Sequence, residues 1–326
     1  MIPPEPRANP RFEGHDESVN ALRHAAQSGR LHHGWLFAGP AGIGKATLAY
    51  RFGRWLLAGG QSQDLSIPEH SGPFRRVAAG THPDFFSVER RVNAKTEKLQ
   101  SEIVLGTIQE ASAFMRLTPA EGGWRVVVVD GAEDMNTNAA NALLKLLEEP
   151  PARSILLLVC AAPGRLLPTI RSRCRSLAMA PLPDAPMHRL LEAYLPDLDA
   201  ASHTRLAELA EGSIGNALSL VQAGGMALAA LVDEALNGEV KPLRAQAIAD
   251  EVARNTDGAD KFEVFFSLLR GRLAARTRAS ARSGKTNLQG NIALWQDFGK
   301  LEREVLGLNL DKRAAVIVAL EQLQRS

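Results

Sequence analysis

Gly39-Pro-Ala-Gly-Ile-Gly44-Lys45-Ala46 is the stretch of this chain that decides its fold. The octad matches the phosphate-binding P-loop pattern, G-x-x-x-x-G-K-[ST], at every fixed position except the last. An apolar run, Gly34-Trp-Leu-Phe-Ala38, precedes it as a candidate buried strand, and Ala46-Thr-Leu-Ala-Tyr-Arg-Phe follows it as a candidate helix. In that setting, backbone N–H groups at a helix N-terminus face an anion, and a lysine adds positive charge. The sequence therefore predicts a nucleotide-phosphate site at Gly39, Gly42, Gly44 and Lys45.

The last position of the octad departs from the pattern in a way that concerns Mg²⁺. P-loop proteins place a Ser or Thr hydroxyl there as a metal ligand, and Ala46 has none. Thr47 is the next candidate, but one residue along a helix rotates the side chain by about 100°, away from the metal. We therefore expect binding of ATP to be weak or absent, with Thr47 as the possible replacement.

Composition limits the kinds of protein this chain can be. Its 326 residues are 45% apolar, which suits two or three globular domains. The net charge is only +2, so contact with nucleic acid would need a local basic patch. Cys160 and Cys174 form no C-x-x-C pair, so neither a disulfide framework nor a cysteine zinc site is expected. With no long apolar run and no signal-peptide core, we expect a cytoplasmic protein with no membrane partner.

Strand and helix patterns divide the chain. Candidate strands alternate with helical segments, and the continuous β-branched run at 126–129 suits a parallel strand covered on both faces. The expected fold is an α/β domain with a doubly wound parallel sheet over residues 1–181. After Pro181-Leu-Pro-Asp-Ala-Pro186 the pattern is helical, with a break at Gly224-Gly225. We expect a small helical domain at 182–224 and an all-helical domain at 225–326. The strands are expected near residues 35–38, 85–88, 125–129, 155–160 and 177–180.

Asp130 follows the valine-rich strand and is the second candidate residue of the phosphate site. An acid at that strand end is the usual partner of Mg²⁺ in P-loop folds, although it could also only cap the strand. Motor ATPases place a water-orienting Glu directly after this Asp, whereas this chain has Gly131. Glu133 and Asp134 lie nearby, but we expect their carboxylates to point elsewhere on the following turn.

Three further strings give the chain a specific resemblance. They are Thr81-His-Pro-Asp-Phe85, Asn138-Ala-Ala-Asn-Ala-Leu-Leu-Lys-Leu-Leu-Glu-Glu-Pro150-Pro151 and Arg171-Ser-Arg-Cys-Arg175. Together with the P-loop and Asp130, in this order over residues 34–175, they resemble the clamp-loader branch of the AAA+ ATPases in bacterial DNA polymerase III. The resemblance implies an AAA+ P-loop domain, a small helical lid and a C-terminal helical collar that builds a ring with sibling subunits.

The same resemblance implies a role for Arg173. In this family the Arg of Ser-Arg-Cys is an arginine finger, which reaches across a subunit interface to ATP bound by the neighbour. A guanidinium suits that role because it stays charged and offers a rigid fork of donors to phosphoryl oxygens. The alternative is that Arg173 pairs with a carboxylate of its own chain.

Further departures from the motor pattern indicate lost hydrolysis. The position that senses the γ-phosphate holds Cys160 or Ala161, and Gly215 replaces the lid arginine. With Ala46 and Gly131, these losses favour a subunit that keeps the fold and the finger but not its own ATPase. Its expected partners are motor and delta-type subunits in a hetero-oligomeric ring and, through that ring, the sliding clamp and primed DNA.

Zinc and two rival functions complete the expectations. Many relatives carry a four-cysteine zinc module before His-Pro-Asp, but residues 61–80 contain no cysteine, so no metal site is expected. One rival is an autonomous AAA+ ATPase motor, which Lys45 and Asp130 favour. The other is a small-molecule P-loop kinase, for which nothing in the sequence marks an acceptor pocket.

Overall fold

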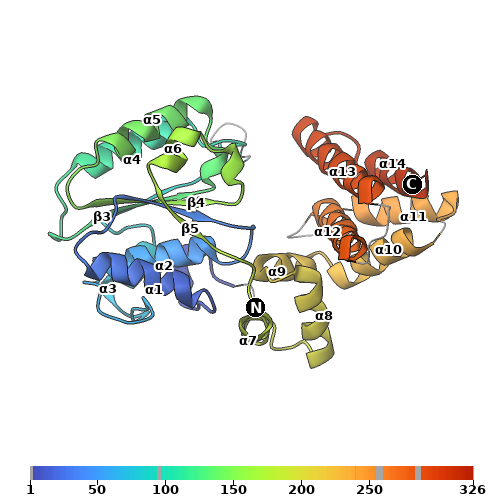
Figure 1. Cartoon of the computed structure of the whole chain (residues 1–326), viewed down its shortest axis with the longest axis horizontal. Helices are drawn as coiled ribbons and strands as arrows, with labels where there is room; N and C mark the ends of the chain where they lie inside the picture. Colours follow the sequence, from blue (N-terminus) through green and yellow to red (C-terminus); the bar gives the residue numbers. More distant parts are fainter. Residues whose placement is uncertain are drawn as a thin grey trace. The chain divides into compact units, whose positions relative to one another are not determined.

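A computed structural model describes residues 3–93, 97, 99–238, 240–254, 260–282 and 288–325. The chain forms two compact units, Met1–Gly215 and Asn216–Ser326, each of which is described by itself. The first unit holds the α/β fold and the second is helical (Figure 1). The further division of the helical part at residues 182 and 225 stays a prediction.

The first unit is built on a five-stranded sheet of order β2-β3-β4-β1-β5. Every pairing between neighbouring strands is parallel, as the sequence predicts. The last strand begins two residues earlier than expected, because Arg175 already pairs with Trp35 of β1. The strands are β1 (Gly34–Ala38), β2 (Phe85–Val88), β3 (Arg125–Asp130), β4 (Ser154–Cys160) and β5 (Arg175–Ala178).

Helices cover both faces of this sheet (Figure 1). Along β3, Val126 and Val128 face one apolar cluster while Val127 and Val129 face the other, and all four are fully buried. This explains why the strand has no polar alternation. One face carries α1 (Asp16–Gln27), α2 (Lys45–Leu57) and α3 (Gly72–Ala78), and the other carries α4 (Leu105–Arg116), α5 (Thr137–Glu148) and α6 (Pro168–Ser172).

Short elements complete the first unit. The polar sequence of segment 61–80, which is interrupted by Gly and Pro, predicts a loop or short excursion, and the segment contains the small helix α3. Pro150 and Pro151 cannot continue a helix and predict the end of the helix that begins near Asn138, which is confirmed because α5 stops at Glu148. Three helices, α7, α8 and α9, follow the last strand along the chain, and α7 packs on α8. The remaining elements are η1 (Pro6–Ala8), η2 (Ala132–Asp134), η3 (Pro163–Arg165), α7 (Asp184–Tyr194), α8 (Ala200–Ala210) and α9 (Ile214–Gln222).

The second unit is a bundle of helices with an aromatic core. Phe262, Phe265 and Phe266 of α12 and Phe298 of α13 are fully buried, and Phe266 meets Phe298 edge to face. Helix α12 packs on α13, and α11 packs on α14. Besides the end of α9, the unit contains α10 (Gly225–Asn237), α11 (Pro242–Ala253), α12 (Lys261–Arg282), α13 (Leu288–Leu308) and α14 (Lys312–Arg325).

No single helix of the described segments is both long and apolar enough to cross a membrane. Helices α9 and α10 meet that test of length and composition only when taken together, and they are bent by 95° at the break between them.

Candidate functional site

The predicted phosphate-site residues meet at one edge of the sheet. Gly39 directly follows β1, while Asp130 and Cys160 are the last residues of β3 and β4. These three strands are neighbours and parallel, so their carboxyl ends lie side by side. The P-loop and the strand-end acid, which are far apart in the sequence, therefore share one site.

The glycines of the loop are required by its backbone. Gly39, Gly42 and Gly44 have φ angles of 157°, 72° and 100°, a region that side chains other than glycine rarely adopt. A Cβ atom at Gly39 would also lie 2.2 Å from the carbonyl oxygen of Met179. The loop thus keeps the compact turn that presents N–H groups at the start of α2.

Lys45 is the first residue of α2 and is only 5% exposed. Its Nζ donates to the carbonyl of Pro40, inside the same loop. Burial lowers the pKa of Lys45, and the negative charges near it, Glu133 first, oppose that shift. Ala46 packs against the core and Thr47 is half-buried in the first turn. The backbone therefore fits a phosphate group, but position 46 offers Mg²⁺ no hydroxyl.

Asp130 occupies an electrostatically costly position. Burial raises its pKa from 3.8 to about 6, and the carboxylates of Glu89 and Glu133 act in the same direction, against Lys45. A strand-end carboxyl held in this way is typical of a functional pocket, since a simple cap would be stabilised as the anion.

The expectation that Glu133 points away from the site is wrong. Gly131 has a φ of 74°, which reverses the chain directly after β3. The reversal directs Glu133 toward the end of β4, where its Oε1 accepts the N–H of Ala161 at 2.7 Å. Its other oxygen, Oε2, is buried with no hydrogen-bond partner among the described residues. Position 131 is therefore a left-handed glycine that the turn requires.

The amino end of α9 lies directly on the P-loop. Gly215 donates its backbone N–H to the carbonyl of Gly42 at 2.9 Å, and the Ser213 hydroxyl donates to the carbonyl of Ala41 at 3.0 Å. A Cβ atom at position 215 would lie 2.7 Å from the Cα of Gly42. Position 215, where the sequence predicts that a lid arginine is lost, therefore has room for glycine only.

The N-terminal segment encloses the loop from another side. The Phe12 ring lies 3.4 Å from the position that a Gly44 Cβ would take, and His15 Nε2 bonds to the carbonyl of Ile43 at 2.9 Å. Burial lowers the pKa of His15, and the hydrogen bond with the Ile43 carbonyl opposes that shift.

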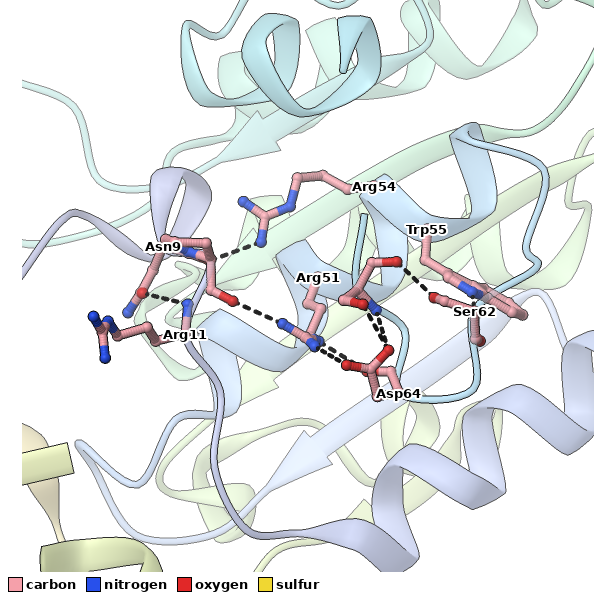
Figure 2. A network of polar contacts seen from close by, with 9 residues as sticks. Asn9, Arg11, Arg51, Arg54, Trp55, Ser62 and Asp64 are labelled. Carbon is pink, nitrogen blue, oxygen red and sulfur yellow. Dashed lines mark hydrogen bonds and ion pairs between the residues drawn. The ribbon is translucent and has the colours of Figure 1, made fainter. Parts of the chain in front are cut away.

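Two arginines of α2 hold that segment in place, and the sequence did not single them out (Figure 2). Arg54 is 2% exposed and donates to the carbonyls of Arg7 at 2.7 Å and Asn9 at 2.8 Å. Arg51 donates to the carbonyl of Pro10 and pairs with Asp64 at 2.9 Å. Charged residues spaced by three within the otherwise apolar run 48–57 were the available signal.

The His-Pro-Asp string has a structural role in this fold. Asp84 is 1% exposed, and its carboxylate accepts the N–H groups of Ala120 and Glu121 at 2.8 and 3.0 Å. His82 is buried and accepts the N–H of Asp84 through Nδ1 at 3.1 Å. These bonds tie the start of β2 to the loop before β3.

Arg173 lies at the amino ends of the strands, opposite the carboxyl ends where the phosphate-site residues meet. It caps the C-terminus of α6 and comes two residues before β5, whereas the P-loop follows the end of the parallel neighbour β1. At the same time Arg173 makes the local ion pair that the sequence left open, with Nη2 lying 2.8 Å from Glu148 Oε1. The structure thus brings the phosphate-site residues together and leaves Arg173 apart from them.

Metal-binding residues do not gather elsewhere in the part of the chain that the structure describes. No group of three or more His, Cys, Asp or Glu side chains there is arranged to hold a metal ion. Cys160 is buried, and burial raises the pKa of its thiol to about 12.

Comparisons with known proteins agree with this geometry. The parallel sheet, the P-loop at its carboxyl edge and the helices after β5 define a P-loop protein of the AAA+ class. A solved structure from Thermotoga maritima, a DNA polymerase III gamma subunit-related protein, shares the fold. Its TM-score is 0.51 at 17% identity, over 94% of this chain and 99% of that one.

Sequence relatives give the family. The family described as DNA polymerase III, delta subunit, matches residues 14–183, more than half of the chain, and the chain belongs to it. DNA polymerase III subunit delta' of Pseudomonas aeruginosa is 37% identical over 68% of this chain and 65% of that relative. DNA polymerase III subunit tau of Escherichia coli is 31% identical over 64% of this chain and 31% of that relative. The matched part is less than two thirds of either relative's length.

Proposed function

We propose that this chain is a clamp-loader subunit of DNA polymerase III that does not hydrolyse ATP itself. It occupies a place in a ring of AAA+ subunits and supplies Arg173 to the ATP bound by a neighbour. Family membership and the resemblance of the motifs support the replication role. The place of Arg173 on the sheet supports the proposal that this arginine acts on a nucleotide bound by another subunit.

The position of Arg173 is the observation that carries the proposal. Its own P-loop follows β1, a strand of five residues, and Arg173 precedes the parallel neighbour β5. At about 3.3 Å per residue, the length of β1 puts roughly 16 Å between the amino and carboxyl ends of these strands. An arginine at the amino ends of the strands is thus poorly placed for a nucleotide on the P-loop of its own chain. It is better placed for a nucleotide on another subunit.

The departures from the motor pattern support the loss of hydrolysis. Ala46 offers no metal ligand, Gly131 is needed for a turn, and Gly215 is needed for close packing on the P-loop. Weak nucleotide binding through Gly39, Gly42, Gly44 and Lys45, with Asp130 and Thr47 as neighbours, remains compatible with this geometry. We propose no zinc and no other metal for the chain.

The partners follow from the same proposal. They are motor and delta-type loader subunits, which form the ring, and the sliding clamp and primed DNA, which the ring brings together in the cytoplasm. Contact with DNA would be with phosphates and largely independent of sequence.

Reconstitution of the loader with Arg173 variants tests the proposal. Arg173→Ala should leave assembly intact and lower both ATP hydrolysis and clamp loading by the complex. Arg173→Lys should restore little, because a point charge does not reproduce the planar fork. Arg171→Ala removes an exposed arginine of the same helix and serves as the control. Wild-type loading by the Arg173→Ala complex would refute the finger role.

A further inference from the structure

The guanidinium of Arg173 is held by two elements of its own chain. Nη1 donates to the carbonyl of Thr169 in α6 at 3.2 Å, and Nη2 pairs with Glu148 at the end of α5 at 2.8 Å. We propose that Glu148 is a positioning residue, which holds the Arg173 side chain extended at the sheet edge before a neighbouring subunit arrives. The inference rests on the proposed finger role of Arg173.

The backbone at both residues of this ion pair is held in place by contacts with residues at the start of β1. His33 Nε2 bonds to the carbonyl of Leu147, the residue before Glu148, at 2.9 Å. A Cβ atom at Gly34 would lie 2.8 Å from Leu147 Cδ2 and 3.4 Å from the carbonyl oxygen of Arg173. The end of α5 and the turn before β5 therefore meet at the first residue of β1, and their spacing is fixed by contact with it.

Helix stability does not explain the carboxylate at position 148. Glu148 is the last residue of α5, where the negative end of the helix dipole disfavours an acidic side chain. The ion pair itself adds little to stability, since the side chains are 38% and 48% exposed and water screens the attraction between surface charges. The contact does, however, constrain where the Arg173 guanidinium lies.

Pre-organisation is the benefit that such a contact gives. A long arginine side chain has many rotamers, and a finger must lose much of this freedom on reaching a phosphate. The contacts with Thr169 and Glu148 remove part of that freedom in advance. They use one N–H of each terminal nitrogen, and a guanidinium has about five N–H donors, so others are left for a phosphoryl oxygen.

The test is a double-mutant cycle in the assembled loader, with ATP as the probe. Glu148→Gln should lower kcat for ATP hydrolysis several-fold with little change in KM, because the finger acts in the transition state. Glu149→Gln, which removes the next and also exposed carboxylate, should match wild type. In the Arg173→Ala background, Glu148→Gln should cause no further loss. The thermal midpoints of the isolated variants should stay within a few degrees of wild type.

The outcomes separate the two proposals. If Arg173→Ala has no effect, the finger role itself fails. Arg173→Ala could lower the rate while Glu148→Gln leaves it unchanged or raises it. In that case the finger role of Arg173 is supported and the positioning role of Glu148 is overturned. An equal loss from Glu148→Gln with and without Arg173 also overturns it, because Glu148 would then act by another route.

Discussion

Gly215 donates its backbone N–H to the carbonyl of Gly42 at 2.9 Å, so the amino end of α9 is bonded directly to the P-loop. The sequence predicts that Gly215 stands where a motor subunit has a lid arginine. Here the approach is so close that a single Cβ atom would lie 2.7 Å from the Cα of Gly42. Close packing on the P-loop is therefore the structural reason for a glycine at position 215.

Gly215→Ala should destabilise the protein, although Gly→Ala in a helix usually stabilises. We expect a loss of about 1–3 kcal/mol in the free energy of unfolding, because backbone must move to admit the methyl group. Gly106→Ala in α4, where a Cβ would meet nothing within 4 Å, should be neutral or stabilising by up to about 1 kcal/mol. Urea unfolding compares the two. Equal effects of both substitutions would contradict the packing argument.

Gly215→Arg should not restore ATP sensing. The arginine has no space at this position, so the substitution should loosen the contact instead of adding a phosphate ligand. Hydrogen exchange of residues 39–45 should become faster, and affinity for ATP should not increase. Tighter ATP binding by this variant would show that the lid can move away from the loop at low cost.

Asp130→Asn should stabilise the protein increasingly as pH rises. Because the folded-state pKa of Asp130 is about 6, above its usual 3.8, the folded form favours the proton and the cost of ionisation appears between these values. Relative to wild type, the gain should be small at pH 4 and reach on the order of 1–3 kcal/mol at pH 7. Urea unfolding at several pH values measures it, with Asp197→Asn as an exposed control. A gain that is constant with pH would contradict the burial of an uncompensated charge.

The isolated chain should release phosphate from ATP no faster than its Lys45→Ala variant. Binding of ATP measured by calorimetry should be weak and should change little when Mg²⁺ is chelated, since Ala46 provides no hydroxyl. Turnover that DNA stimulates and that Lys45→Ala abolishes would instead favour the autonomous motor. Tight binding that chelation abolishes would indicate that Thr47 or another group ligates the metal.

Metal analysis of protein purified without chelator should give less than one equivalent of zinc. Segment 61–80 has no thiol, and its helix α3 begins at a serine cap, with Ser71 accepting the N–H of Phe74. Stoichiometric zinc that survives dialysis would refute this prediction.

Arg54→Met should cost about 2–4 kcal/mol, because the buried carbonyls of Arg7 and Asn9 would lose their donors. The N-terminal segment should then become sensitive to limited proteolysis. Arg75→Met, at an exposed position of α3, should change stability by no more than about 0.5 kcal/mol. If the two variants unfold at the same urea concentration, Arg54 does not anchor the segment.

Local sequence patterns were sufficient to predict the parallel sheet and the P-loop turn of the candidate site. The glycine spacing at 39–44 and the apolar run at 126–129 predict the P-loop and a doubly covered parallel strand, and both are confirmed. The proline pair after Glu149 predicts where α5 stops. Each of these signals depends on residues within a few positions of one another, so the sequence carries them directly.

The remaining features depend on contacts between distant parts of the chain. The turn that directs Glu133 back to Ala161, and the burial of Arg54 under the N-terminal segment, follow from packing and leave no periodic signal. Arg173 is assigned to the edge opposite its own P-loop only once β1 and β5 pair in parallel, and its contact with Glu148 requires that pairing too.

The sequence by itself determined the class of fold, the glycine-rich turn at 39–44 and the residues Ala46, Gly131 and Gly215, which depart from the pattern expected of a motor subunit. Only the tertiary structure decided why two of those residues are glycines. Ser213 and Ala41 are 172 residues apart, yet they are hydrogen-bonded, and the neighbouring position 215 has no room for a Cβ atom against Gly42. The backbone turn at Gly131 is likewise fixed by where β3 ends in the sheet. Such constraints arise when parts of the chain far apart in sequence occupy the same volume, so local composition does not encode them.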